Sequence, residues 1–486
     1  MARLRLWIGA SAADAGVRLA AQMLSTVVVA RLLAPEQFGL ALMVLSVVAV
    51  AMAFVGRPFE EALAQRRRLL TTHLEVALFV SLVLTGVSIA LALALGPGLA
   101  RLAGLPEIAP LLPAASLFLV AEGPGVIVRA LARRYGRYVE LGFCQSASVV
   151  VASLVAIWAA TAGLGVWALI LQRMLPNLLF PLMALVVARR RDRVLLIRPR
   201  WHAARFGEIV RFSWLNLADV GVGAATGAAM SFVVNALFGT AVLGQVNIAM
   251  RLVEPLRLLI GGVGHNIVFS LLARMQTEPE RLGRGAADAV ANVSSLAVPA
   301  FFGIAVSAPI LLPLLAGPGW EEAVPLSQAL CLAAAISVPF GFLYTGFSAL
   351  GRPEIGVAGA CLNLAVLMVG LQLAQGLPPA SGIGGALVAA SAAESGLAIA
   401  LLLRVAGRGA GAALGRTARV WLASGLMVGL LWLLYPLGPR PLTVSLPLLA
   451  AVVATGLVAY PILLLLLCRH CFQSLQATLL PSKSRT

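Results

Sequence analysis

The chain has 486 residues, of which 60% are hydrophobic and 11% are charged, and its formal net charge is +17. A soluble domain averages about 45–50% apolar and about 25% charged residues, so this chain lacks the polar surface that a water-soluble protein needs. The composition excludes a soluble fold. Because the basic residues lie in short breaks between apolar runs, the positive charge also argues against a nucleic-acid partner.

Fourteen apolar runs are long enough to cross a bilayer, which takes roughly 20 mostly apolar residues for about 30 Å of hydrocarbon. We therefore predict an all-α polytopic membrane protein with about 14 transmembrane helices. We expect the first run to be a retained helix, since no apolar signal-peptide core precedes its small residues. In chain order the predicted spans are 9–32, 38–56, 74–96, 109–129, 139–160, 164–188, 211–235, 248–272, 289–315, 327–349, 357–376, 383–404, 420–437 and 445–467.

The distribution of arginine predicts the orientation of these spans through the positive-inside rule. With the N-terminus in the cytoplasm, cytoplasmic segments contain the arginine runs 66–68, 133–134 and 189–191. We therefore expect a multi-pass protein of the bacterial cell inner membrane with both termini cytoplasmic. The predicted periplasmic loops contain three basic residues, Arg31, Arg101 and Arg440.

The chain also repeats itself weakly after six helices. Residues 31–40 are similar to residues 236–245, an offset of 205, and further matches follow in order at offsets of about 214 and 219. An even number of helices brings both copies in from the same side, so we predict two parallel six-helix repeats plus two C-terminal helices around a central cavity. The predicted parts are an N-terminal lobe at 1–188, a cytoplasmic linker at 189–210, a C-terminal lobe at 211–404, and helices 13 and 14 with a cytoplasmic tail at 405–486.

Ionisable side chains inside the predicted spans are the candidate functional groups, because each costs at least about 2.5 kcal/mol to insert and normally faces a cavity or a partner. Asp14 and Asp219 are 205 residues apart, so each lobe places a carboxylate at the same repeat position. Both are candidates for binding a coupling ion or a proton. In the structural alternative, Asp14 pairs with Arg18 one turn away and Asp219 makes a local hydrogen bond.

Four arginines in or beside the spans are candidate substrate-binding residues, since a guanidinium binds a phosphate through two parallel hydrogen bonds. Arg18 and Arg251 are the stronger candidates, and Arg57 and Arg257 follow. Arg251 can instead pair with Glu254 in its own helix. Arg57 lies at the cytoplasmic end of its span and can extend into the lipid headgroups.

Glu122 and Glu394 complete the coupling-ion or proton candidates. Arg129 follows Glu122 by two helical turns on the same face, which favours a structural ion-pair network. Glu394 has no basic residue nearby in its own helix and is the candidate for a proton relay.

Other motifs indicate neither an enzyme nor a cofactor. Cys468 and Cys471 form a single C-x-x-C pair, and no second pair completes a tetrahedral zinc site. The sequence has no Walker loop and no nucleophile elbow. Its loops are too short for the large periplasmic loop that a glycan polymerase or ligase requires. We therefore expect a transporter without a metal.

Residues 30–39, Ala-Arg-Leu-Leu-Ala-Pro-Glu-Gln-Phe-Gly, and 61–67, Glu-Ala-Leu-Ala-Gln-Arg-Arg, resemble the polysaccharide transporter or oligosaccharide flippase family. That family belongs to the multidrug/oligosaccharidyl-lipid/polysaccharide (MOP) exporter superfamily. The sequence departs from the pattern at Ala34, where Gly is usual, and at Val234-Asn235, where Asp is frequent. The resemblance implies two six-helix lobes around a V-shaped cavity and alternating access.

The resemblance also implies the cargo, an undecaprenyl-pyrophosphate-linked oligosaccharide repeat unit. It would move from the cytoplasmic to the periplasmic leaflet for the synthesis of exopolysaccharide, lipopolysaccharide O-antigen or capsule. The implied partners are membrane lipids, a polysaccharide polymerase and a chain-length regulator. Two alternatives from the same superfamily stay open, a cation-coupled multidrug exporter and a peptidoglycan lipid-precursor flippase.

Overall fold

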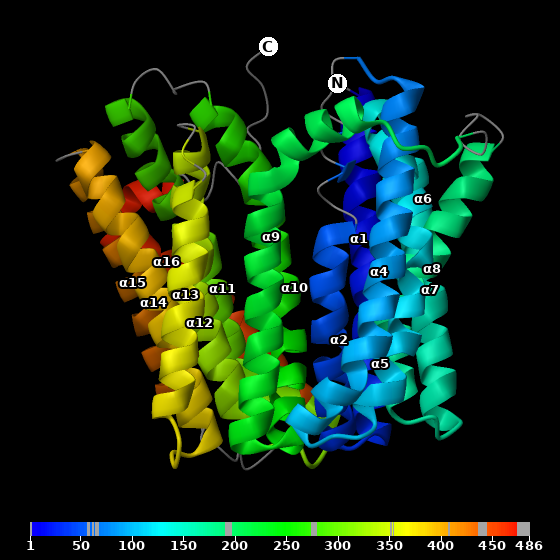
Figure 1. Ribbon diagram of the computed structural model, residues 1–486. Helices are drawn as coiled ribbons and strands as arrows, with labels where there is room; N and C mark the ends of the chain where they lie inside the picture. The colour runs from blue at the N-terminus through cyan, green and yellow to red at the C-terminus, as the bar shows by residue number, and fades with distance from the viewer. Residues whose placement is uncertain are drawn as a thin grey trace. The chain divides into compact units, whose positions relative to one another are not determined.

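The computed structural model is built from helices (Figure 1), and no strand occurs in the described residues, which confirms the all-α prediction. Within some helices only the backbone is described, and this applies to residues 2–13, 209–219 and 262–273 among others. The structure describes residues 2–55, 59–60, 63, 68–189, 197–273, 279–349, 352, 354–406, 409–435 and 445–473.

The chain divides into two compact units, and the first comprises Met1–Gly244. Within it α7 packs against α1 and α8, and α2 packs against α9. Its helices are α1 (Ala2–Leu32), α2 (Pro35–Val55), α4 (Thr71–Ala103), α5 (Ile108–Ser116), the 3-10 helix η1 (Leu117–Ala121), α6 (Glu122–Arg134), α7 (Tyr138–Thr161), α8 (Val166–Arg189), α9 (Ala203–Phe238) and the first turn of α10 (Thr240–Ala273).

The second unit comprises Gln245–Thr486. Within it α11 packs against α12 and α15, while α14 packs against α12 and α13. After α10, its helices are α11 (Pro279–Ala316), α12 (Ala323–Ala349), α13 (Glu354–Leu373), α14 (Pro379–Ala406), α15 (Gly409–Leu434) and α16 (Leu446–Leu467).

Thirteen helices in the described part of the chain are long and apolar enough to cross a membrane. Each corresponds to one of the fourteen predicted spans, so the chain is a multi-pass membrane protein. The predicted span without a counterpart among the thirteen is 248–272, which lies within α10. That fourteenth span stays a prediction.

The fourth predicted span, 109–129, is not one continuous α-helix. It consists of α5, the five-residue 3-10 helix η1, and α6. Pro124 has no N–H for the carbonyl of Val120, and its ring clashes with a carbonyl four residues back, which disfavours α-helical geometry there. A short 3-10 segment relieves this conflict. The break places Glu122 in the first turn of α6.

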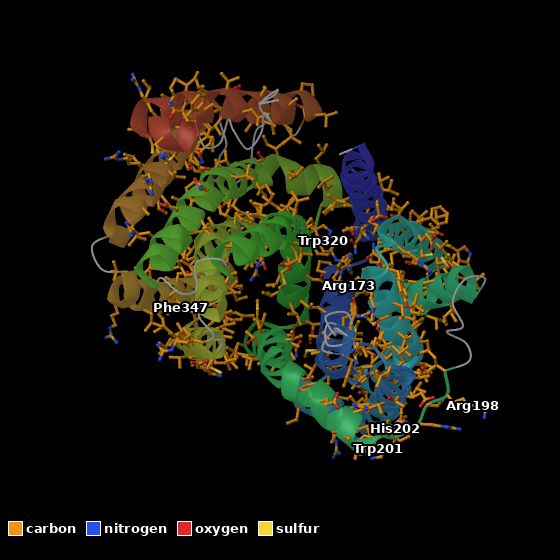
Figure 2. The ribbon with its side chains drawn as sticks, turned by 90° about the horizontal axis from the view of Figure 1, so that it is seen from above. Arg173, Arg198, Trp201, His202, Trp320 and Phe347 are labelled. Carbon is orange, nitrogen blue, oxygen red and sulfur yellow. The ribbon has the colours of Figure 1, made fainter. Side chains whose placement is uncertain are left out.

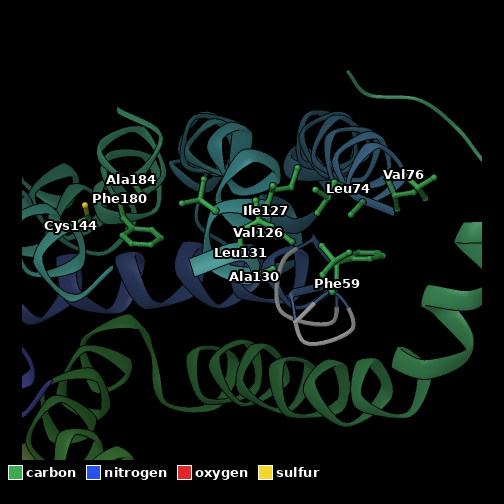
Figure 3. Close-up of a cluster of buried hydrophobic side chains, with 14 residues drawn as sticks. Phe59, Leu74, Val76, Val126, Ile127, Ala130, Leu131, Cys144, Phe180 and Ala184 are labelled. Atoms are coloured by element: carbon green, nitrogen blue, oxygen red, sulfur yellow. The ribbon is translucent and has the colours of Figure 1, made fainter. Parts of the chain in front are cut away.

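A buried apolar cluster surrounds this part of the first unit (Figure 3). It brings together Leu74 from α4, Ile127 from α6 and Phe180 from α8, all at most 8% exposed. Any charge held among these side chains is removed from water. Its electrostatic interactions are therefore stronger than they would be at the surface.

Candidate functional site

Arg129 in α6 forms ion pairs with two buried carboxylates. Its Nη2 lies 2.6 Å from Glu122 Oε2, and its Nε lies 2.7 Å from Glu60 Oε2. Arg133, one turn later, places its Nε 3.0 Å from the other Glu60 oxygen. We call these four residues the Arg129 network. Two carboxylates and two guanidinium groups balance in charge, so the charges of these four residues compensate one another away from water.

The fold of α6 and α8 explains how the Arg129 network is positioned. Glu122 lies in the first turn of α6, where the helix dipole stabilises a negative charge, and Arg129 follows on the same face. A side chain at Gly125 would place its Cβ 2.9 Å from Pro181 Cγ, so glycine allows α8 to approach. As a result, the Arg129 guanidinium lies 5.6 Å above the centre of the Phe180 ring. The network that the sequence predicted for Glu122 and Arg129 is present.

A second charged cluster joins α1 to α7. Arg18 Nη2 lies 3.0 Å from Asp14 Oδ2, and the hydroxyl of Ser146 donates a hydrogen bond to Asp14 Oδ1. A Cβ at Gly142 would lie 3.1 Å from the Asp14 carboxyl carbon, so a glycine on α7 leaves room for the carboxylate. The structure thus contains the Asp14–Arg18 pair of the structural alternative. An anionic ligand at Arg18 would compete with Asp14.

The other arginine candidates differ in their surroundings. Arg251, in the second unit, is half-buried and donates from Nε to Asn247 Oδ1 at 3.2 Å. Arg257 is exposed, and its Nη1 lies 3.9 Å from Glu254 Oε2. Glu254, the partner that the sequence offered to Arg251, therefore has Arg257 beside it. Arg57 and the side chain of Asp219 lie outside the described residues.

Glu394 in α14 lies where three helices of the second unit meet. Asn363 in α13 donates from Nδ2 to Glu394 Oε2 at 2.9 Å. The hydroxyl of Tyr344 in α12 donates to the backbone oxygen of Glu394 at 2.8 Å. The carboxylate therefore accepts a hydrogen bond from a neutral amide on a neighbouring helix.

Sequence reasoning missed two features that depend on contacts distant in the chain. Glu60 is one; its only local signal is its place beside Arg57-Pro58 at the end of a span. The second missed feature is a pair of His–Glu contacts that joins the linker and the start of α9 to α4. His73 Nε2 lies 3.2 Å from Glu208 Oε2, and His202 Nε2 lies 3.1 Å from Glu75 Oε2.

An aromatic contact strengthens this attachment of the linker. The ring of Trp201 lies 4.8 Å from that of Phe206 and 6.0 Å from that of Phe79 in α4. Figure 2 shows Trp201 and His202 side by side where the linker meets α9, with Arg198 extending from the same segment. The linker is therefore packed on the first unit along residues 197–202.

The C-x-x-C cysteines make no metal site in the part of the chain that is described. No group of three metal-ligating side chains occurs among those residues. Burial, with a smaller effect from Cys468, raises the pKa of the Cys471 thiol to about 12. The thiolate that a metal requires is therefore scarce at neutral pH.

The long apolar helices make the chain an all-α multi-pass membrane protein. Ion pairs such as Arg129–Glu122 and Arg18–Asp14 lie within its candidate spans. The chain belongs to the family described as polysaccharide biosynthesis protein, whose model matches residues 28–325. The match covers more than half of the chain and includes the Arg129 network and the Asp14 partner helix α7.

Two curated bacterial relatives are similar to this chain. It is 25% identical over 326 residues to the lipopolysaccharide biosynthesis protein WzxC of Escherichia coli (strain K12), covering 65% of this chain and 64% of WzxC. It is 25% identical over 319 residues to the succinoglycan biosynthesis transport protein ExoT of Rhizobium meliloti (strain 1021), covering 64% of this chain and 62% of ExoT. The matched region is thus less than two thirds of either relative.

Solved structures share the fold. The lipid II flippase MurJ in an inward closed conformation matches with a TM-score of 0.72 at 11% identity, over 96% of this chain and 99% of MurJ. An inward-facing multidrug resistance MATE family transporter of the MOP superfamily matches with a TM-score of 0.62 at 16% identity, over 84% of this chain and 98% of its own. The chain therefore has the fold of the MOP superfamily.

Proposed function

We propose that this protein flips an undecaprenyl-pyrophosphate-linked oligosaccharide repeat unit across the bacterial inner membrane, from the cytoplasmic to the periplasmic leaflet. The observation that carries the proposal is the family match over residues 28–325. Two relatives named for lipopolysaccharide and succinoglycan biosynthesis support it. Transport would proceed by alternating access, with both termini in the cytoplasm. A polysaccharide polymerase and a chain-length regulator would act next to the flippase.

The pyrophosphate gives the cargo a negative charge. The membrane potential can therefore drive the movement of the cargo. Moving each negative charge out of a negative interior gains roughly 2.3 kcal/mol per 100 mV. Arg18 and Arg251, followed by Arg57 and Arg257, are the residues that we assign to the phosphates. Their guanidinium groups would replace part of the hydration that the phosphates lose inside the membrane.

The pairing of Asp14 with Arg18 couples anion binding to a second charge. While Asp14 is ionised, it occupies one edge of the Arg18 guanidinium at 3.0 Å. A proton or a cation on Asp14 would release that edge for a phosphate oxygen. We therefore assign coupling-ion or proton binding to Asp14, with Asp219, Glu122 and Glu394 as the further carboxylates of the same role.

The test is complementation of a strain that lacks the gene. Loss of the protein is expected to remove surface polysaccharide and to cause lipid-linked oligosaccharide to accumulate in the cytoplasmic leaflet. Arg18→Ala and Arg251→Ala are each expected to lower surface polysaccharide. Arg205→Ala is the matched control, because it removes the same charge from an exposed pair with Glu208. Undiminished polysaccharide in both test variants at normal protein abundance would refute the phosphate assignment.

The same strain separates the two alternative cargoes. Increased sensitivity to cationic drugs with intact surface polysaccharide would favour a multidrug exporter, whose fold this chain shares. Inability to delete the gene, with accumulation of the peptidoglycan lipid precursor after depletion, would favour a lipid II flippase. Surface polysaccharide loss in a viable strain is the outcome that our proposal predicts.

A further inference from the structure

The two matched segments of the internal repeat each begin a helix. In the first copy α2 begins at Pro35, and in the second copy α10 begins at Thr240, which are 205 residues apart. A glycine follows four residues later in each copy, at Gly39 and Gly244. The repeat therefore places a glycine one turn into each of two equivalent helices.

These two helix starts touch each other through the backbone, and each glycine contacts the first residue of the opposite copy. A Cβ at Gly39 would lie 2.0 Å from the Thr240 carbonyl oxygen, and a Cβ at Gly244 would lie 1.8 Å from the Pro35 carbonyl oxygen. Both distances are far below van der Waals contact, so neither position accommodates a side chain. The contact is reciprocal, as a twofold relation between the copies requires. We call these four residues the glycine clasp; all lie within the first unit.

The glycine clasp is flanked by matched apolar residues, and hydrogen bonds anchor its Thr240 side. Phe38 and Leu243, which precede the two glycines and correspond in the repeat, are both 0% exposed. Thr240 donates to Asn235 Oδ1 at 2.7 Å, and Asn235 donates from Nδ2 to Ala103 O at the end of α4 at 3.0 Å. The Thr240 side of the clasp is therefore held by hydrogen bonds to its surroundings as well as by its contact with Gly39.

Close glycine packing is common between membrane helices, where small residues let backbones approach. The reciprocity between repeat copies distinguishes the clasp from ordinary packing. Alternating access needs contacts between the copies that part and re-form at low cost. The contact consists of glycines against backbone carbonyls and is flanked by apolar side chains. When the two helix starts separate, this contact leaves no charged group without a partner.

We propose that the glycine clasp is a gate that opens and closes during the transport cycle, an inference that rests on the proposed function. The arginine distribution predicts that the clasp lies on the periplasmic side. In the closed gate Phe38 and Leu243 are shielded from water. Opening exposes both of them to the aqueous phase.

The experiment measures the labelling of a cysteine next to a clasp glycine in the full-length protein, after its five native cysteines are replaced by alanine. Leu243→Cys is exposed to a membrane-impermeant maleimide in intact spheroplasts and in inverted vesicles. Adding Gly39→Ala is expected to raise its labelling rate in spheroplasts by about tenfold, a bias of about 1.4 kcal/mol toward the open gate. Phe38→Cys with Gly244→Ala is expected to respond in the same way.

Matched controls come from α9. Gly223→Ala and Gly227→Ala add the same methyl group where nothing lies within 4 Å, and they are expected to leave labelling unchanged. A Leu243→Cys chain that transports but is never labelled would overturn the proposal, as would unchanged labelling in both clasp variants at normal abundance. Raised labelling in the clasp variants, together with intact surface polysaccharide in a strain that lacks the gene, would support the gate while contradicting the proposed cargo.

Discussion

Replacing Arg129 with alanine removes the guanidinium that Glu60 and Glu122 share, and both of these carboxylates are at most 5% exposed. Breaking a buried ion pair by deleting one partner costs about 3–5 kcal/mol, because the remaining charge has lost its compensation. Here two carboxylates are affected, although Arg133 still contacts Glu60. We therefore expect Arg129→Ala to lower the free energy of unfolding by at least about 3 kcal/mol.

Arg133→Ala is the matched control, because the Arg133 side chain is 50% exposed and faces the same Glu60. Arg129 still compensates Glu60 in this variant, so the control is expected to lose only about 0–1 kcal/mol, as a solvent-exposed ion pair does. A third variant replaces Glu60, Glu122 and Arg129 together by glutamine. It is expected to recover most of the loss, since no buried charge is left without its partner and the Arg133 side chain is half exposed to water.

Equilibrium unfolding in mixed detergent micelles measures these differences, and thermal unfolding in one detergent gives the same ranking. The expected order of stability is wild type and Arg133→Ala together, then the triple glutamine variant, then Arg129→Ala. If Arg129→Ala loses no more stability than Arg133→Ala, then the buried carboxylates do not depend on Arg129. If the triple variant is no more stable than Arg129→Ala, lost packing outweighs lost charge.

Three further variants test other sites. Glu394→Gln keeps an oxygen that accepts the amide hydrogen bond, so it is expected to fold but to lose transport; full transport at normal abundance would contradict a proton role. His73→Ala removes a buried imidazole and is expected to lower the free energy of unfolding by about 1–3 kcal/mol. Its control, exposed Arg205→Ala, is expected to cost less than about 1 kcal/mol. Equal losses in the two variants would contradict the His–Glu attachment. Alanine at Cys468 and Cys471 is expected to leave abundance and chelator resistance unchanged, and stoichiometric zinc in the purified protein would show that expectation to be wrong.

Much of the fold follows from hydropathy, since a bilayer accepts a helix on length and apolar content alone. Thirteen predicted spans have a counterpart for this reason. Hydropathy carries no information on backbone hydrogen bonding. The apolar run 109–129 therefore predicted one continuous helix. The break at η1 follows from proline chemistry at Pro124, which a hydropathy window averages away.

In the candidate site, contacts within one helix could be predicted from the sequence, whereas contacts between distant segments could not. Asp14 with Arg18, and Glu122 with Arg129, could be predicted because helical periodicity places each pair on one face. The contact between Glu60 and Arg129 spans 69 residues in the sequence. No periodicity links such a pair, since it depends on how a segment after α2 packs against α6.

The Arg129 network also has a consequence for the insertion of α6 into the membrane. An arginine costs about 2.5–3.5 kcal/mol at the centre of a helix on translocon insertion scales, and less towards the end of a span, where Arg129 lies. Ribosomes synthesise Glu60 and Glu122 before Arg129, so both acidic residues have left the ribosome when the cation reaches the translocon. We expect nascent chains that carry glutamine at both acidic positions to integrate α6 less efficiently, because glutamine keeps the polarity of glutamate but loses the charge that pairs with Arg129; glycosylation-site mapping would detect the difference. The chain order therefore makes both acidic partners of Arg129 available when α6 enters the membrane.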